Sequence, residues 1–241
     1  MSLPFFYTPT ITAGSKELVL HEDTSRHIVQ VLRMQNEEQL QLTDGLGNLF
    51  TAKITDNNKK ACSVNILTVQ QLPLLQQSVT IAISLVKNNS RFEWFLEKAT
   101  EIGVAEIVPL ICSRTEKQHF KYERMNNILI SAMLQSQQAR LPVLHEPVKF
   151  ADYLIRSSAV QSENKFIAHC EDESNKVSLP VNRTHTASTI LIGSEGDFTK
   201  DEIALALKHN YIPVSLGETR LRTETAGIVS AVLLVSAKSN N

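Results

Sequence analysis

Apolar and polar residues alternate in short stretches over the first 70 positions, and the pattern then changes to continuous apolar runs separated by amphipathic segments. Alternation with a period of two is typical of half-buried strands, whereas apolar runs between helical segments are typical of parallel strands. The sequence therefore predicts two domains of different class, a small β domain at residues 1–72 and an α/β domain at residues 73–241.

The predicted β domain consists of strand-like stretches separated by turn sequences. Asp44–Asn48 and Asp56–Lys60 contain the Gly, Asn and Asp residues that favour hairpin turns. The strands are expected at Leu18–Leu20, Gln39–Thr43, Leu49–Ile54 and Cys62–Leu67. This pattern favours a small β-barrel or sheet.

One helix is expected within the β domain, after the first strand. Asp23 or Thr24 can cap its start, and Ile28, Val29 and Leu32 form one apolar stripe at helical spacing.

The second domain follows a polar, turn-like linker at Gln70–Ser78. Its strands are expected at Val79–Val86, Glu106–Cys112, Lys165–Cys170, Ser188–Ile192 and Ile212–Leu216. Its helices are expected at Arg91–Gly103, Tyr122–Gln138, Phe150–Ser157, Lys200–His209 and Ala226–Ala237. Strands that alternate with helices in this way predict a mostly parallel sheet with helices on its faces.

Composition places the chain among ordinary folded proteins. Its 241 residues are 42% hydrophobic and 20% charged, and no apolar run approaches the ~18 residues that a membrane span needs. The start lacks the pattern of a secretory signal, so we expect a cytoplasmic protein. Cys62, Cys112 and Cys170 are odd in number and set far apart in apolar stretches, which predicts buried thiols and no metal site. The net charge of −1 gives no general attraction to nucleic acids.

Two glycine-containing loops, Ile190–Thr199 and Ser215–Ala226, each connect an apolar strand to a helix. Thr199 and Glu202 have the spacing of a capping box, which supports the first of these turns. Because ligands bind outside the carboxyl ends of strands in α/β sheets, the loops predict one shared pocket. The loops lack a dinucleotide fingerprint and a Walker lysine, so we do not expect a phosphate site; ordinary turns are the alternative.

The second loop concentrates charge. Arg220 and Arg222 lie just before an apolar helix, where two cations oppose the positive end of the helix dipole. Their position indicates that the loop holds a polar or anionic group, although solvated charges are also common at a helix start.

These two loops, through Ile192–Thr199 and Leu216–Ala226, resemble the cofactor-loop motifs of the ribosomal RNA small subunit methyltransferase E family, in the SPOUT class of methyltransferases. The similarity covers nearly the whole chain in the same order, through His27–Met34, Asp44-Gly45, Lys98–Val104, Arg114 and Gln135–Pro142.

The chain departs from the family pattern in two places. Where the family commonly has Gly-Pro-Glu-Gly-Gly, Ser194 and Asp197 change the second and fifth positions, which we expect to be tolerated if Asp197 faces solvent. Gln137 and Gln138 stand in place of a usual Gly-Arg pair, which leaves Arg140 as the only arginine before Pro142.

The resemblance implies an N-terminal PUA-like β-barrel for RNA and a C-terminal α/β domain with a deep trefoil knot. It implies S-adenosylmethionine as cofactor, a homodimer, and N3 of one uridine near the 3′ end of 16S ribosomal RNA, in the small ribosomal subunit, as target. It places the cofactor at His169, Ile192, Gly193, Glu195, Gly196, Leu216, Gly217, Leu221, Arg222, Thr223, Thr225 and Ala226. A non-catalytic RNA-binding or ribosome-assembly protein with the same fold is the alternative, and an α/β enzyme for another small molecule is a second one.

Uridine is a poor nucleophile at N3 because that atom carries a proton. An arginine beside the base can stabilise the anion that remains when the proton leaves, and Arg222 is the first candidate. Glu224 either orients Arg222 or acts as the base, or it is simply a carboxylate favoured at a helix N-terminus.

A local basic segment supplies candidate RNA contacts. Arg114–Arg124 contains four permanent cations, two aromatic side chains and two acids, a mixture that suits phosphates and unstacked bases. A plain solvated loop is the alternative. Two arginines of the N-terminal helix and one before Pro142 are further candidates. The full set of candidate RNA-binding residues is Arg26, Arg33, Arg114, Lys117, Lys121, Arg124 and Arg140.

Overall fold

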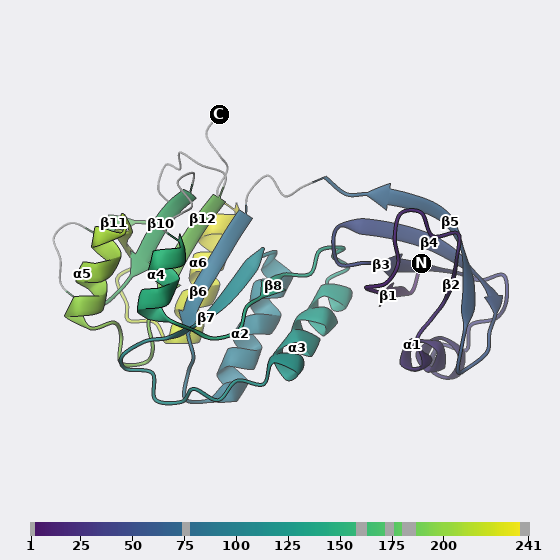
Figure 1. The fold of residues 1–241 in the computed structure, drawn as a ribbon, viewed down its shortest axis with the longest axis horizontal. Helices are drawn as coiled ribbons and strands as arrows, with labels where there is room; N and C mark the ends of the chain where they lie inside the picture. Colours follow the sequence, from purple (N-terminus) through teal and green to yellow (C-terminus); the bar gives the residue numbers. More distant parts are fainter. Residues whose placement is uncertain (1–2, 74–77, 158–162, 172–175, 180–186, 237–241) are drawn as a thin grey trace. The chain divides into compact units, whose positions relative to one another are not determined.

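The computed structural model describes residues 3–73, 78–157, 163–171, 176–179 and 187–236, and it divides into two compact units (Figure 1). The first unit comprises Met1–Leu74 and Met133–Leu141, and the second comprises Leu75–Ala132 and Pro142–Asn241. The segment Met133–Leu141 thus belongs to the first unit although it lies in the middle of the chain. Residues 74–77 of the expected linker lie outside the described residues.

The first unit is built on a five-stranded sheet in the order β1-β3-β4-β5-β2. The strands are β1 (Phe5–Tyr7), β2 (Glu17–Val19), β3 (Gln39–Thr43), β4 (Asn48–Asp56) and β5 (Ser63–Gln71). β1 and β3 are parallel, and the other neighbours are antiparallel. Buried Leu40, Leu42, Phe50, Ala52 and Ile54 alternate with less buried residues, which confirms the predicted half-buried strands.

The helix of the first unit starts differently from its prediction. α1 (Glu22–Arg26) begins after His21, and no side chain caps its first turn. Capping by Asp23 or Thr24 is therefore wrong, because both residues already lie inside the helix. Acidic residues in a first turn still favour the helix through its dipole.

This helix continues as a π-helix, η1 (His27–Val31), in which the Leu32 N–H donates to the His27 carbonyl at 3.0 Å. A π-turn is wider than an α-turn, so side chains after it no longer follow the α-helical spacing. Ile28 is buried and Val29 packs against the core, but Leu32 is 42% exposed. The predicted apolar stripe is therefore wrong at Leu32.

The second unit is built on an eight-stranded sheet in which every described pair of strands is parallel. Its order is β11-β13-β10-β12-β6-β7-β8, and β9 also pairs with β7. The strands are β6 (Ser78–Ser84), β7 (Glu106–Ile111), β8 (Val143–Leu144), β9 (Val148–Lys149), β10 (Glu163–Ala168), β11 (Val177–Ser178), β12 (Ala187–Ile192) and β13 (Ile212–Ser215). The predicted parallel sheet is confirmed.

Helices cover both faces of this sheet, with α2 and α6 on one face and α4 and α5 on the other (Figure 1). The helices are α2 (Asn89–Ile102), α3 (Tyr122–Gln135), α4 (Phe150–Ser157), α5 (Lys200–Lys208) and α6 (Thr223–Ser236). α6 begins three residues earlier than predicted, and Ala237 lies outside the described residues. Among the described helices, none is both long and apolar enough to cross a membrane.

Gly227 lets α6 pack closely against α2 and β6. A Cβ atom at this position would lie 2.6 Å from Cε2 of Phe95 and 2.9 Å from Cδ1 of Ile83. Only glycine fits without a shift of these two buried side chains.

Arg140 holds the segment Met133–Leu141 within the first unit. Its guanidinium donates to the carbonyl oxygens of Leu46 at 2.7 Å, Leu72 at 2.9 Å and Pro73 at 3.3 Å. Three charge-assisted hydrogen bonds to backbone give this side chain a structural role.

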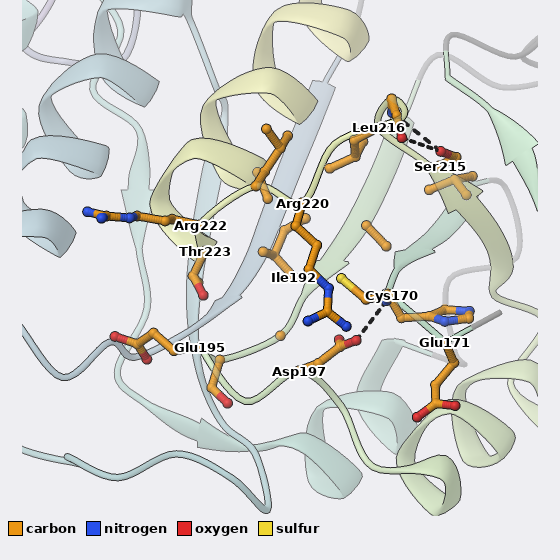
Figure 2. A pocket seen from close by; sticks show the side chains of 18 of the residues that line it. Cys170, Glu171, Ile192, Glu195, Asp197, Ser215, Leu216, Arg220, Arg222 and Thr223 are labelled. Carbon is orange, nitrogen blue, oxygen red and sulfur yellow. Dashed lines mark hydrogen bonds between the residues drawn. The ribbon is translucent and has the colours of Figure 1, made fainter.

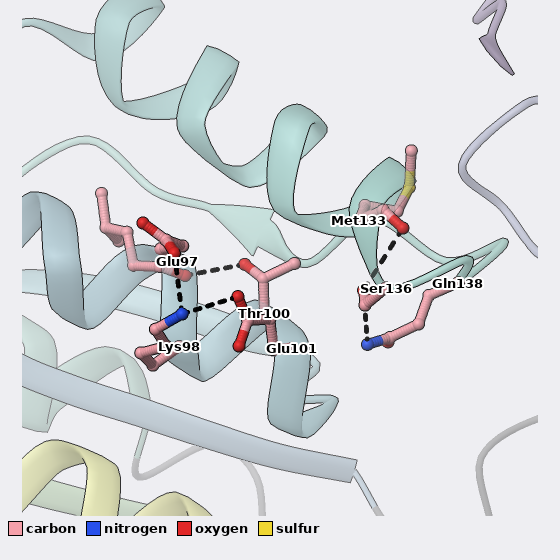
Figure 3. Close-up of polar contacts among 8 residues, drawn as sticks. Glu97, Lys98, Thr100, Glu101, Met133, Ser136 and Gln138 are labelled. Atoms are coloured by element: carbon pink, nitrogen blue, oxygen red, sulfur yellow. Dashed lines mark hydrogen bonds and ion pairs between the residues drawn. The ribbon is translucent and has the colours of Figure 1, made fainter. Parts of the chain in front are cut away.

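Two small polar networks flank the ends of helices (Figure 3). On α2, Lys98 Nζ donates to Glu97 at 2.8 Å and to Glu101 at 2.9 Å. After α3, Gln138 Nε2 donates to Ser136 Oγ at 3.1 Å, which closes the turn that follows the helix. Gln137, in the same turn, has a φ of 54° in the left-handed region that favours glycine.

Candidate active site

The carboxyl ends of β13, β10 and β12 border a cavity of about 850 Å³ (Figure 2). The segments that line it lie at and beyond the ends of these three strands, at residues 168–171, 192–197 and 214–223, and Arg114, Lys176 and Ala226 complete the lining. The two glycine-containing loops therefore share one pocket, as the sequence predicts. A cavity of this size suits a ligand of cofactor dimensions.

All but one of the twelve residues predicted to hold a cofactor line this cavity, and the exception is Thr225. Further lining residues were not assigned to the cofactor from the sequence: Cys170 and Glu171 beyond β10, Lys176 before β11, Ser194 and Asp197 on the first loop, and Glu218, Thr219 and Arg220 on the second. Cys170 and Glu171 follow the carboxyl end of β10, which pairs with β12, and this position indicates that they border the same pocket.

The loop after β12, residues 193–198, is anchored by segments that follow neighbouring strands. The Lys87 N–H, beyond β6, donates to Glu195 Oε1 at 3.0 Å. Arg114, beyond β7, donates from Nη1 to the Gly196 carbonyl at 2.6 Å. This loop is therefore held from the β6 and β7 side of β12.

Asp197 provides a further anchor. Its φ of 66° lies in the left-handed region, and its carboxylate accepts the N–H of Cys170 at 2.7 Å and of Phe198 at 2.8 Å, one on each oxygen. The condition set from the sequence, that Asp197 faces solvent, is not met, because Asp197 is half-buried and its carboxylate links two loops. These hydrogen bonds offset the cost of a left-handed backbone at a residue other than glycine.

Cys170 is an exposed thiol on the pocket wall, whereas Cys62 and Cys112 are buried. The prediction of three buried thiols is therefore wrong at Cys170, because this residue lies beyond the end of β10. Partial burial, and then the Asp197 carboxylate, raise the pKa of the Cys170 thiol, while the positive charge of Arg220 opposes this shift.

Arg220 and Arg222 both line the cavity, but their side chains take different directions (Figure 2). Arg220 extends toward Asp197 and Cys170, whereas Arg222 extends away from them. The loop therefore offers one cation inside the group of pocket side chains and one at its border.

Glu224 lies in the first turn of α6 and does not line the cavity. Its side chain is 8% exposed, and Oε1 lies 3.7 Å from Nε of Arg91 on α2. Oε2 is buried without a hydrogen-bond partner among the described residues. This position agrees with a carboxylate stabilised by the helix N-terminus and one arginine.

Two of the four cations in the predicted basic segment bind partners within the protein. Arg114 donates to carbonyls of the pocket loop, and Arg124 donates to both carboxylate oxygens of Glu93 at 2.7 and 3.0 Å. Lys117 and Lys121 are exposed, as are both arginines. The two lysines differ from the arginines in that neither side chain is held by such a contact among the described residues.

The aromatic residues of this segment pack against the second unit. The Phe120 ring lies edge-to-face at 6.2 Å from Phe92 of α2 and at 6.5 Å from Tyr122. The Tyr122 hydroxyl donates to the Leu144 carbonyl at 3.2 Å. Both rings therefore stabilise the position of the segment.

The remaining RNA candidates lie in the first unit. Arg26 pairs with Glu22 at 2.8 Å, one helical turn away. Arg33 is exposed and has a φ of 57°, and Arg140 binds backbone carbonyls as described above. Among the described residues, no group of three or more His, Cys, Asp or Glu side chains could hold a metal ion.

Comparisons with known proteins agree with this geometry. The RNA methyltransferase domain family matches residues 73–235, and the RNA methyltransferase PUA domain family matches residues 20–67. A ribosomal RNA small subunit methyltransferase E from Rickettsia conorii is 27% identical over 226 residues, which cover 93% of this chain and 91% of the relative.

Two solved structures are similar over nearly their whole length. A probable rRNA-methyltransferase from Porphyromonas gingivalis is 36% identical, with 95% of each chain covered and a TM-score of 0.85. A ribosomal RNA small subunit methyltransferase E from Neisseria gonorrhoeae, bound to S-adenosyl methionine, is 27% identical, with 95% of each chain covered and a TM-score of 0.83.

The fold and the pocket thus define an RNA methyltransferase that joins a PUA domain to an α/β catalytic domain. The predicted α/β class with a separate PUA-like domain is confirmed. The chain belongs to the ribosomal RNA small subunit methyltransferase E family.

Proposed function

We propose that this protein transfers a methyl group from S-adenosylmethionine to N3 of one uridine near the 3′ end of 16S ribosomal RNA, within the small ribosomal subunit in the cytoplasm. The observation that carries the proposal is the single cavity lined by both family loops and by the end of β10. In this assignment residues 1–72 bind RNA and residues 73–241 perform the transfer.

The lining of the cavity suits this cofactor. Ile192, Leu216 and Leu221 offer apolar surface to a flat base, and Glu195 and Arg220 offer opposite charges to an amino acid group. Glycines let backbone amides and carbonyls approach the ligand closely. When bound, the cofactor supplies an electrophilic methyl carbon. We assign its binding to His169, Ile192, Gly193, Glu195, Gly196, Leu216, Gly217, Leu221, Arg222, Thr223, Thr225 and Ala226.

Arg222 is the residue that we assign to the target base. Its guanidinium, at the border of the pocket, is suited to stabilise negative charge on a uracil that has lost its N3 proton. Glu224 is assigned to the same machinery, although its burial outside the pocket wall and its pairing with Arg91 argue against the role of base. N3 lies on the Watson-Crick edge, so the uridine must leave its pairing to react.

RNA contacts are proposed at six of the seven basic residues that the sequence indicates. Lys117 and Lys121 are the best supported, because both are exposed and, unlike the arginines of their segment, neither side chain is held by a contact among the described residues. Arg26, Arg33, Arg124 and Arg140 complete the set, and three of these also hold partners within the protein. The guanidinium of Arg114 instead binds the Gly196 carbonyl.

We also propose that two copies form a homodimer along α6. This helix is apolar almost all round, and Val232 is 44% exposed while Ile228, Val229, Leu233 and Val235 are partly exposed. An exposed apolar face along a helix is typical of an interaction surface. The deep trefoil knot of the SPOUT class is part of the same proposal.

Reverse transcription across 16S RNA tests the product. A methyl group on N3 blocks pairing, so cells that contain the protein should show a stop near the 3′ end that is absent from cells without it. Complementation with Arg222→Ala should lose the stop, while Arg156→Ala, an exposed arginine on α4, should retain it. An unchanged stop pattern on deletion of the protein contradicts the proposed product.

Calorimetry distinguishes the enzyme from a non-catalytic RNA-binding or assembly protein. We expect S-adenosylmethionine to bind the purified protein and to slow alkylation of Cys170, the exposed thiol on the pocket wall. Cys62 and Cys112 are buried and serve as internal controls that alkylate slowly with or without cofactor. No heat and no protection of Cys170 favour the non-catalytic alternative.

A further inference from the structure

Arg114 connects the end of β7 to the pocket loop that follows β12. β6 lies between these strands in the sheet, yet the segments that follow β7 and β12 meet beyond its end. Its Nη1 donates to the Gly196 carbonyl at 2.6 Å and to the Phe198 carbonyl at 3.4 Å. In the opposite direction, the Ser194 hydroxyl donates to the Arg114 carbonyl at 3.1 Å. The contact is therefore reciprocal and involves three residues of one loop.

The aliphatic part of Arg114 also packs closely against the loop. A Cβ atom on Gly196 would lie 3.2 Å from both Cβ and Cδ of Arg114, so the aliphatic part of the arginine runs along the glycine. Arg114 itself lines the cavity. A single nitrogen, Nη1, makes both hydrogen bonds, so one charged group holds two carbonyls of the loop.

We propose that Arg114 is a positioning residue of the cofactor pocket, and that its charge serves the loop 193–198 instead of an RNA phosphate. The inference rests on the proposed function, since it concerns the site assigned to S-adenosylmethionine. The loop presents its backbone to the ligand, so the direction of the Gly196 carbonyl determines which groups meet the cofactor. Arg114 fixes that direction because its guanidinium binds the carbonyl.

The two roles predict opposite changes in two measurements. For Arg114→Gln, the positioning role predicts that the Kd for S-adenosylmethionine rises about tenfold or more, because charge-assisted hydrogen bonds to the loop are lost. It predicts that binding of small ribosomal subunits, at saturating cofactor, keeps its salt dependence. A phosphate contact predicts an unchanged cofactor Kd and a salt slope that falls by about 0.9.

Lys117→Gln is the matched control, since it removes an exposed cation three residues further along the chain. We expect it to lower the salt slope of subunit binding and to leave the cofactor Kd unchanged. Equal cofactor affinity in Arg114→Gln and the unmodified protein would overturn the proposal.

Ser194→Ala tests the same contact without any change of charge. It removes the hydroxyl that donates to the Arg114 carbonyl and should raise the cofactor Kd several-fold, with subunit binding unaffected. If Arg114→Gln does not fold, this variant decides the question, and an unchanged cofactor Kd in Ser194→Ala rejects the proposal. Failure of the unmodified protein to bind S-adenosylmethionine would instead reject the proposed function itself.

Discussion

Gly227 is the residue at which α6 lies closest to its neighbours, and it yields a direct test of the packing. Gly227→Ala should lower the free energy of unfolding by about 1–3 kcal/mol, because the new methyl group would meet the Phe95 ring and Ile83. Trp94, the single tryptophan, lies on α2 and reports unfolding of this unit by its fluorescence.

Gly14→Ala is the matched control, because nothing lies within 4 Å of the added Cβ atom. Its free energy of unfolding, from circular dichroism, should stay within about 0.5 kcal/mol of the unmodified protein. A loss of equal size in both variants would show that the close approach of α6 does not explain the effect.

Cys112 makes the stability depend on alkaline pH. Burial, with a smaller effect of the Glu202 carboxylate, raises the pKa of its thiol from 9.0 to about 12. Above pH 9 the thiol of the unfolded chain loses its proton while the folded thiol keeps it, so the unfolded state gains stability. The free energy of unfolding should therefore fall between pH 9 and about 12 by at most ~1.4 kcal/mol per pH unit.

Urea unfolding at pH 8, 9, 10 and 11 measures this effect. Cys112→Ser should start from a lower stability at pH 8 and decline less steeply, since serine does not ionise in this range. Parallel pH profiles for the two proteins would show that Cys112 keeps the same pKa when folded and unfolded.

Residue identity alone did not predict the environment of these side chains. Cys112 and Cys170 both follow an apolar run, yet one is buried and the other is exposed on the pocket wall. Asp197 and Gln137 both adopt positive φ, at positions where glycine would be the simplest choice. At Asp197 the carboxylate accepts the N–H of Cys170, 27 residues earlier, a partner that a local pattern does not contain.

At the scale of elements, features closed by local hydrogen bonds were predicted best. The capping box of Thr199 and Glu202 is confirmed, and so is the end of α2 at Gly103, which has a φ of 96°. In contrast, β1 was missed because Phe5–Tyr7 pairs with a strand more than 30 residues later. The residues that cap a helix lie within a few positions of each other, so a local sequence pattern includes them. The partner of a strand can lie far away in the chain, and a local pattern does not include it.

The end of α3 offers a test with opposite signs at two nearby glutamines. Gln137 is exposed and left-handed, so Gln137→Gly should raise the free energy of unfolding by about 0.5–1 kcal/mol through relief of backbone strain. Gln135 is the last residue of α3 and is not left-handed, so Gln135→Gly relieves no strain and should lower the free energy of unfolding by up to about 1 kcal/mol, because glycine is freer in the unfolded chain. Thermal unfolding of both variants measures the difference, and a stability loss in both would contradict the strain at Gln137.

At the scale of the whole molecule, the sequence predicted two structural classes and the shared pocket. It did not predict that Met133–Leu141 belongs to the first unit, because this depends on how Arg140 reaches three carbonyls distant in sequence. The prediction of pocket residues at the end of β10 contained only His169, for a related reason. Only the order of strands in the sheet shows that β10 lies beside β12.

The proposed homodimer gives a test at the same scale. A charge in an apolar interface is costly, so Val232→Glu on α6 should sediment as a monomer while the unmodified protein sediments as a dimer. Ile155→Glu, on α4 and 65% exposed, should remain dimeric. Sedimentation velocity at micromolar concentration decides, and a dimer of Val232→Glu would exclude the α6 face as the interface.

The pairing of β6 with β12 has a consequence for how the protein is made. Ser78–Ser84 and Ala187–Ile192 are neighbours in the centre of the second sheet, although roughly 100 residues separate them in the chain. At about 5–20 residues per second of synthesis, a nascent β6 waits on the order of 5–20 s for its partner. Its apolar edge is open during that time, which favours aggregation or capture by chaperones. The yield of folded protein should therefore depend on the speed of translation as well as on final stability.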